Sequence, residues 1–358
     1  MGRKKINENN KKDNKKRLDR NNVKSKRIVW IVVSALVLTI GNGIIGFMST
    51  SASNNDIPTS QNITGNWMDI HGIGMYPSDN GKDSSLYLAT HNGLFIKDNS
   101  SSAWKEIGDD KSDFMGFTIN PSKEGVMYSS GHPQTGGNLG FRTSDDYGAT
   151  WQKVSDVTTP NPIDFHTMTI GNNPEIIYAA SGMGDNIFIS TDEGKNWTIT
   201  NLPGGQLVIT LAANQTNSNI LYAATTNGLF SSTDQGKGWQ KINSDLIGGN
   251  DTMVTGIEIS SDGKTAYAFA VPNPTSENEN GYILKSTDGG KIWAKTDGQI
   301  AGVQFASKFA FGNNGEIYAT VTQDSVETGV ASSVFSSNDD GKTWTLEGTN
   351  NNKLLGGT

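Results

Sequence analysis

The sequence predicts an all-β protein, a six-bladed β-propeller that follows one N-terminal transmembrane helix. Three observations carry this prediction: a tryptophan motif that recurs at a near-constant period, alternating apolar segments between its copies, and one long uncharged segment near the N-terminus. The length of 358 residues suits either two domains or a single ring of repeats. The repeat favours the ring.

The first 27 residues are strongly basic, whereas the rest of the chain is acidic. They contain 12 Lys or Arg and three acidic residues, which leaves 17 basic and 33 acidic residues in the remainder. A phosphate backbone is bound by clustered positive charge, so we expect no nucleic-acid partner. The chain also contains no Cys, which excludes a disulfide scaffold, a thiolate zinc site and a cysteine nucleophile.

The segment 28–48 has no charged residue and directly follows the basic residues. As a helix it would be about 32 Å long, enough to cross the hydrocarbon core of a bilayer. The positive-inside rule then keeps residues 1–27 in the cytoplasm and places the remainder outside the cell membrane as a single-pass protein. A cleaved signal peptide, with 28–40 as its apolar region and cleavage near Ala52, is the alternative, although the apolar segment is longer than a signal peptide needs.

The domain organisation follows from these segments. We expect a basic cytoplasmic segment at 1–27, a retained signal anchor at 28–48, a flexible stalk at 49–65, the propeller at 66–348 and a C-terminal tail at 349–358.

The motif Ser-x-Asp-x-Gly-x-x-Trp occurs five times, with its aspartates at Asp146, Asp192, Asp234, Asp288 and Asp339. A sixth, degenerate copy is recognisable because residues 93–107 align without gaps on residues 228–242. Starting from Trp104, successive motif tryptophans are 47, 46, 42, 54 and 51 residues apart. Periods of about 40–50 residues are typical of propeller blades.

Each period contains the same pattern of strands. One alternating apolar segment leads through a short turn to a second, a third enters the motif, and a fourth starts at its Trp. The predicted first strands are 71–76, 115–120, 166–171, 209–214, 255–260 and 307–312, and the predicted second strands are 86–90, 126–130, 176–180, 220–225, 265–270 and 316–321. Six such periods predict six four-stranded blades, to which residues 61–67 could add an edge strand.

The motif resembles the Asp-box (BNR) repeat of sialidases, of Vps10/sortilin ectodomains and of photosystem assembly factor propellers. The runs DIHGIG, LYLATHNGLF, SGHP and DFHTM are in addition similar to bacterial membrane-anchored Asp-box proteins of the glycosyl hydrolase-like type. The resemblance implies that the boxes lie on the outside of the ring and that their five aspartates are structural. A sialidase is excluded, because such enzymes hold the substrate carboxylate with three arginines, and Arg142 is the one arginine after residue 27.

The four histidines occupy equivalent positions in blades 1 to 3. Two of them and one methionine begin first strands, the other two end second strands, and an acid precedes each first-strand position by two residues. The residues that begin first strands are His71, Met115 and His166, and those that end second strands are His91 and His132. The acids two residues before the first-strand positions are Asp69, Asp113 and Asp164. Strand direction places them all on the face that carries the longer loops, where binding residues are expected. If Met75 pairs with Tyr87, His71 faces His91 across the first hairpin.

Three interpretations of this cluster stay open. The polar side chains can simply satisfy backbone groups at the channel mouth. They can hold a divalent metal ion, Zn²⁺ or a copper ion, through His71, His91 and His166. They can also form a ligand pocket of the four histidines and Met115, in which Asp69, Asp113 and Asp164 are candidate catalytic carboxylates for glycoside cleavage. A surface module that binds a glycan, peptide or protein is the favoured function, and a glycoside hydrolase is the alternative.

Overall fold

Six sheets follow one another along the chain, one for each tryptophan period, and each contains four consecutive antiparallel strands. Blades 1 to 3 consist of β2 (Ile70–Met75), β3 (Ser85–Thr90), β4 (Gly93–Asp98) and β5 (Lys105–Ile107); β6 (Asp113–Ile119), β7 (Met127–His132), β8 (Phe141–Ser144) and β9 (Gln152–Ser155); and β10 (Thr167–Asn172), β11 (Glu175–Ala180), β12 (Asn186–Ser190) and β13 (Thr198–Asn201).

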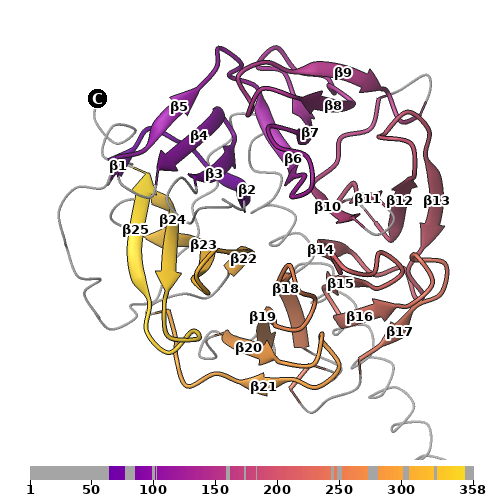
Figure 1. Ribbon diagram of the computed structural model, residues 1–358, viewed down its shortest axis with the longest axis vertical. Coiled ribbons are helices and arrows are strands. Elements are labelled where there is room, and N and C mark those ends of the chain that lie inside the picture. Colours follow the sequence, from indigo (N-terminus) through magenta and orange to yellow (C-terminus); the bar gives the residue numbers. More distant parts are fainter. Residues whose placement is uncertain are drawn as a thin grey trace, which may run out of the picture. The chain divides into compact units, whose positions relative to one another are not determined.

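Blades 4 to 6 repeat this order. They consist of β14 (Val208–Ala213), β15 (Leu221–Thr225), β16 (Gly228–Ser232) and β17 (Gln240–Lys241); β18 (Thr252–Ile259), β19 (Ala266–Pro272), β20 (Tyr282–Ser286) and β21 (Ala294–Lys295); and β22 (Ala306–Phe311), β23 (Ile317–Ser325), β24 (Gly329–Ser337) and β25 (Thr345–Asn350). Figure 1 shows the blades in chain order around a ring, with the first strand of each blade innermost. The prediction of an all-β, six-bladed propeller is confirmed, and the ends of the predicted first and second strands differ from the observed ones by at most four residues.

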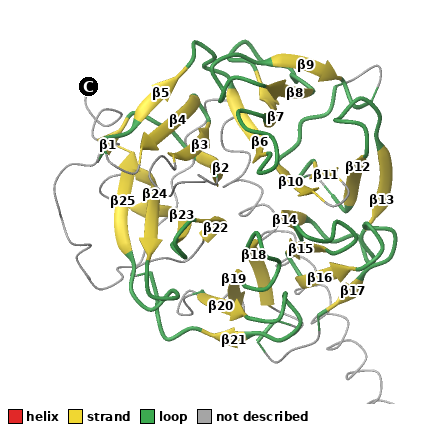
Figure 2. Cartoon of the chain, viewed as in Figure 1, coloured by secondary structure: helices red, strands yellow, loops and turns green. Residues whose placement is uncertain are grey.

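The computed structural model describes residues 64–76, 85–98, 101, 103–158, 162–172, 175–182, 184–242, 246–247, 252–272, 281–300, 306–325 and 329–350. These residues form strands and loops only, as Figure 2 shows, so none of them belongs to a helix that could span a membrane. The predicted cytoplasmic segment, the anchor at 28–48 and most of the predicted stalk lie outside the described residues.

The ring is closed by a short parallel strand. In β1 (Thr64–Gly65), Thr64 pairs with Thr349 and Gly65 with Asn350, which makes β1 a fifth strand on the outer edge of blade 6. The possible edge strand at 61–67 is therefore confirmed at Thr64–Gly65, within the segment expected to be stalk. The indole of Trp67 then donates to the carbonyl of Ser332 in blade 6, at 3.1 Å, and its ring lies 5.8 Å from that of Phe95 in blade 1.

The hydrophobic core lies between neighbouring blades. The second strands are buried on both faces: in β15 every residue is buried, and in β11 every residue after Glu175 is. Aromatic rings complete the contact, as where Trp197 of blade 3 packs at 5.2 Å from Phe141 of blade 2 and 5.0 Å from Phe165. Burial of both sheet faces explains why these strands are continuously apolar.

Each Asp box closes its own turn between the third and fourth strand of a blade. In blade 3, the Ser190 hydroxyl donates to Asp192 at 2.9 Å, and Asp192 accepts the backbone N–H of Asn196 at 2.9 Å. The Trp197 indole donates to the carbonyl of Gly194, which has φ +82° and touches Phe141 so closely that a Cβ there would lie 2.0 Å from the ring. The other four boxes make the same Ser–Asp and Trp–Gly bonds, so their aspartates are engaged within their own turns.

Substitution of a box tryptophan should destabilise the ring strongly. Trp293 is 6% exposed and packs into the core between blades 4 and 5, whereas the neighbouring side chain of Ile292 is 74% exposed. We expect Trp293→Ala to lower the free energy of unfolding by about 3–5 kcal/mol and Ile292→Ala by about 0.5 kcal/mol or less. Denaturant unfolding of both variants measures this difference, and equal small losses would contradict the structural role of the box.

Candidate functional site

Two clusters of imidazole and carboxylate groups lie at the rim, the end of the central channel at which β2, β6 and β10 begin. Rim triad 1 consists of His71, His91 and Asp113, and rim triad 2 of His132, Asp164 and His166. In each triad the three candidate ligand atoms all lie within 4.8 Å of one another. All four histidines of the chain therefore meet a carboxylate.

In rim triad 1 one carboxylate serves two imidazoles of the preceding blade. Asp113, the first residue of β6, has Oδ1 3.3 Å from His71 Nε2 and Oδ2 2.8 Å from His91 Nδ1. The Asp113 side chain is 7% exposed, and that of His91 is 23% exposed. Burial lowers the pKa of His71 below its usual value despite the Asp113 charge, whereas pairing with Asp113 raises the pKa of His91.

A β-bulge directs His71 into this triad. The pairing of β2 with β3 shifts between Ile70 and Gly72, so His71 is the extra residue, and a bulge of this kind re-aims a side chain. The predicted register was wrong: Met75 pairs with Leu86 rather than Tyr87, and His71 does not face His91 across the hairpin. The two rings nevertheless lie 6.1 Å apart, because both turn toward Asp113.

Rim triad 2 joins blades 2 and 3. Asp164 Oδ2 lies 2.7 Å from His132 Nε2 and 3.0 Å from His166 Nε2, and the Asp164 side chain is 8% exposed. The His132 ring also places Nδ1 2.8 Å from the carbonyl of Gly137 in the long loop after β7. Gly182, at φ +69°, lies against the His166 ring so closely that a Cβ would come within 2.8 Å of it.

The charges of rim triad 2 stabilise one another. Pairing with Asp164 raises the pKa of His132 to about 9. Burial opposes ionisation of Asp164, but the two imidazoles outweigh it and hold the pKa of that carboxyl below its usual range. Asp113 also favours the cationic form of His132, and His166 disfavours that of His71, so the two triads form one electrostatically connected site.

The structure divides the predicted site residues differently from the sequence pattern. The predicted metal set of His71, His91 and His166 is split, because His166 belongs to the second triad. Met115 is 2% exposed, and no contact described for it reaches either triad. Asp69 lies outside both triads and accepts a hydrogen bond from Ser332 at 3.3 Å through its carboxylate. Of the three acids that precede a first-strand position by two residues, Asp164 alone pairs with the residue that follows it at that spacing, His166, whereas Asp113 pairs with His71 and His91 of the preceding blade.

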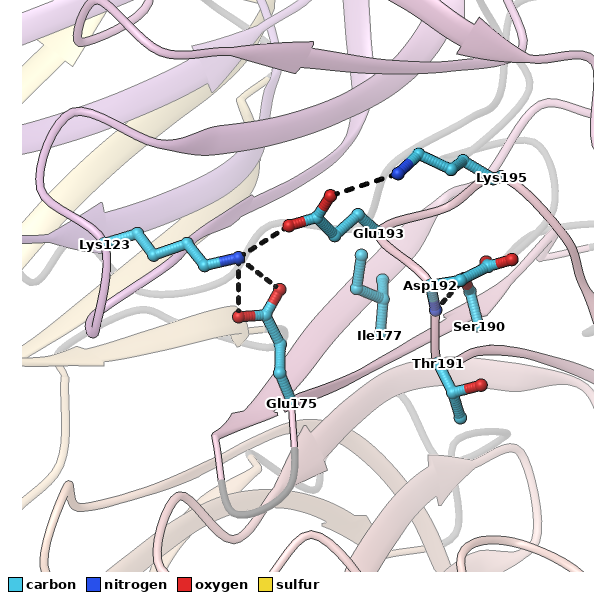
Figure 3. Close-up of a pocket in the computed structure, with 8 residues that line it drawn as sticks. All are labelled: Lys123, Glu175, Ile177, Ser190, Thr191, Asp192, Glu193 and Lys195. Carbon is cyan, nitrogen blue, oxygen red and sulfur yellow. Dashed lines mark hydrogen bonds and ion pairs between the residues drawn. The ribbon is translucent and has the colours of Figure 1, made fainter.

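A hollow lies on the face opposite the rim, beside the Asp box of blade 3. It has a volume of about 320 Å³, and Figure 3 shows Lys123 of blade 2 reaching between Glu175 and Glu193 of blade 3. The Lys123 ammonium lies 3.0 Å from Glu175 and 2.8 Å from Glu193, and the Lys123 and Glu193 side chains are 41% and 53% exposed. Exposed ion pairs of this kind contribute little to stability, and here they connect blades 2 and 3.

The central channel carries one pair of opposite charges. A cavity of about 150 Å³ is lined by residues of all six first strands, among them Glu258 and Lys308. Loss of hydration raises the pKa of Glu258 to about 7 and lowers that of Lys308 to about 8. The carboxylate of Glu258 accepts the backbone N–H of Ile259 at 3.1 Å.

A family model described as Sortilin, neurotensin receptor 3 (Sortilin-Vps10), matches residues 139–250, which include the boxes of Asp146, Asp192 and Asp234. No curated protein matches the sequence. Similar solved structures include an ancestral GH74 enzyme (15% identity, TM-score 0.52), a GH74 enzyme of Niastella koreensis (18%, 0.53) and the GH74 xyloglucanase of Xanthomonas campestris (13%, 0.53).

These matches cover 81%, 80% and 79% of this chain but only 39%, 47% and 46% of the GH74 chains. The chain thus spans less than half the length of the GH74 proteins that it matches. At such low identity the likeness shows a shared propeller fold. The family match is limited to residues 139–250, which form β8 to β17 and the segments around them.

The channel pair predicts a pH dependence of stability. Because the pKa of Glu258 is about 7 in the folded chain and 4.5 as a free group, the native state binds more protons than the unfolded state between these values. Stability should therefore fall as the pH rises from about 4.5 to 7, by on the order of 1–3 kcal/mol. Unfolding of Glu258→Gln between pH 4.5 and 7.5 should lack this fall, while the exposed control Glu106→Gln should keep it; identical pH profiles for wild type and Glu258→Gln would contradict the assignment.

Proposed function

We propose that the chain is a membrane-anchored, extracytoplasmic binding protein whose propeller holds its ligand at the rim of blades 1 to 3. The observation that carries this proposal is the gathering of all four histidines with Asp113 and Asp164 in two triads at one end of the channel. The carboxylates are almost fully buried, while His91 and His132 remain 23% and 27% exposed. Such a rim presents charged donors and acceptors on a rigid scaffold, as binding sites require.

The polar half of the rim also has long loops beside it. The loop after β7 reaches the site through the bond between Gly137 and His132, and Asn138 in the same loop donates to the carbonyl of Pro162 at 2.8 Å. Rim triad 2 is therefore flanked by the loop after β7 and by the segment around Pro162 that precedes β10. Loops on a fixed scaffold are where binding surfaces are usually built.

A receptor-like role agrees with the family match. The matched model is named for a receptor, sortilin or neurotensin receptor 3, and its 112 residues include β8 to β17. A peptide, protein or glycan ligand outside the cell is the corresponding proposal for this chain. The proposed outward orientation of the propeller rests on the uncharged segment 28–48 and on the basic residues before it.

A glycoside hydrolase is the alternative, supported by the GH74-like fold and by carboxylates on neighbouring blades. A general acid for glycoside cleavage needs a raised pKa, and that of Asp164 is lowered by its two imidazole partners. Asp113 is likewise held between two imidazoles. Asp164 is therefore better arranged to hold its two histidines than to donate a proton, which favours binding over hydrolysis.

The proposal is tested on intact cells that express the full-length chain with an epitope tag after Thr358. A phage library of random peptides is selected on these cells, and labelled xyloglucan oligosaccharides are applied to the same cells. We expect antibody staining of the tag on unbroken cells and at least one retained probe. Replacement of both carboxylates in Asp113→Asn/Asp164→Asn should weaken its binding at least about tenfold, because each buried acid orients two imidazoles.

The matched control is Glu193→Gln, an exposed acid on the opposite face, which should bind the probe as wild type does. Equal binding by the rim double variant would refute the rim as the ligand site. Tag staining only after permeabilisation would refute the outward orientation. Release of reducing ends from xyloglucan by wild type but not by the double variant would favour the hydrolase instead.

A further inference from the structure

We propose that the rim binds two divalent transition-metal ions, one between His71, His91 and Asp113 and the other between His132, Asp164 and His166. Each triad offers two imidazole nitrogens and one carboxylate, the donor set of many three-ligand metal sites. This inference goes beyond ligand binding at the rim and does not depend on it. It also differs from the single site that the sequence pattern suggests, because the structure divides the histidines in two.

The spacing of the donor atoms suits metal ligation. With metal–nitrogen distances of about 2.0–2.1 Å and tetrahedral angles, two ligand atoms of one ion lie roughly 3.3–3.4 Å apart. The nitrogen–oxygen distances in rim triad 1 are 3.3 and 2.8 Å, and those in rim triad 2 are 2.7 and 3.0 Å. The third distance in each triad, between the two imidazole nitrogens, is at most 4.8 Å, so side-chain shifts of roughly 1 Å would bring each set to coordination distance.

Several donor atoms lack hydrogen-bond partners. Asp164 Oδ1 is buried and makes no hydrogen bond within the described residues, and the buried atoms His71 Nε2 and Asp113 Oδ1 face each other at 3.3 Å without meeting hydrogen-bond geometry. Buried polar atoms are almost always hydrogen-bonded, and each exception requires an explanation. Lone pairs that converge on one point from an imidazole and a carboxylate are satisfied by a cation at that point.

The second nitrogen of His132 supports the same conclusion. Its Nδ1 faces the carbonyl of Gly137 at 2.8 Å while its Nε2 faces Asp164 at 2.7 Å. With an acceptor on both sides, the ring needs either two protons or one proton and a metal ion. A metal-bound histidine commonly donates its other N–H to a backbone carbonyl, which fixes the tautomer and the ring orientation.

The donor set also indicates which ions fit. Imidazole and carboxylate without thiolate suit Zn²⁺ or Cu²⁺, and oxygen-preferring ions such as Mg²⁺ and Ca²⁺ rarely take two imidazoles. Three protein ligands leave at least one coordination position for water or for an oxygen or nitrogen donor of a ligand. Because His91 and His132 are the more exposed members, solvent reaches both triads from the loop-bearing face.

The stoichiometry of bound zinc tests the inference directly. The purified full-length chain is stripped with EDTA, loaded with ZnSO₄, dialysed against metal-free buffer and analysed by mass spectrometry for zinc per chain. We expect two ions for wild type, one for Asp113→Asn, one for Asp164→Asn and none for the double variant. Zinc should also raise the melting temperature of wild type but not of the double variant, because ligand binding to the native state adds to its stability.

Glu193→Gln is the matched control, since Glu193 is an exposed acid on the opposite face and belongs to neither triad, and it should keep two ions. His91→Gln and His132→Gln, at the more exposed positions, provide a second pair of variants that should each lose one ion if the aspartate variants fold poorly. One ion or none in wild type, or unchanged zinc in the double variant, would overturn the inference. If the double variant loses zinc but binds the probe as wild type does, only the ligand proposal is refuted. If probe binding requires the triads but wild type binds no zinc, only the metal proposal is refuted.

Discussion

The contact between one blade and the next is the constraint on which the rest of the structure depends. A four-stranded sheet with apolar residues on both faces is not stable by itself, and here Trp197, Phe141 and their equivalents fill the space between neighbouring sheets. Ring closure by Thr64–Gly65 and Trp67 extends the same packing to the junction of blades 6 and 1. Every blade is thereby held at a fixed place relative to its neighbours.

Rim triad 1 and the pairing of His132 with Asp164 both depend on this contact. Asp113 belongs to blade 2 but pairs with two histidines of blade 1, and Asp164 of blade 3 reaches back to His132 of blade 2. No single blade contains a complete triad. Small changes in blade packing would therefore alter the distances on which imidazole–carboxylate pairing or metal ligation depends. The tryptophan boxes stabilise the ring on its outside, while the imidazole–carboxylate triads lie at its inner rim.

The sequence predicted the blades well because their causes are local. The Asp box needs Ser, Asp, Gly and Trp at set spacings within one turn, and alternating apolar residues follow from the period of a strand. The rim could be predicted only in part. The positions of His71, His91, His132 and His166 on one face followed from strand direction, but their partners did not, because pairing across blades has no local signal. One signal for the pairing was present in the sequence. Asp113 and Asp164 occupy equivalent positions, each in the blade that follows a histidine at the end of a second strand, His91 and His132 respectively.

The β-bulge at His71 could not be predicted from the apolar alternation of the sequence either. One extra residue in β2 changes which side chains face the rim without changing the apolar alternation of the rest of the strand. Register shifts also occur near the start of β6, β14, β18 and β22, whereas β10 pairs with β11 without a shift. Among the residues of the two triads, His71 alone is a bulge residue, because the shift in β6 falls at Phe114 and Met115 and Asp113 itself pairs with His132.

Anomalous X-ray diffraction at the zinc absorption edge would test most directly whether the inter-blade triads are metal sites. Crystals of the full-length chain grown with ZnSO₄ should show two peaks, one within about 2.0–2.2 Å of ligand atoms of His71, His91 and Asp113, and one equally close to those of His132, Asp164 and His166. A map without a peak at either triad, with the imidazoles still 2.7–3.3 Å from Asp113 and Asp164, would contradict metal ligation at the rim.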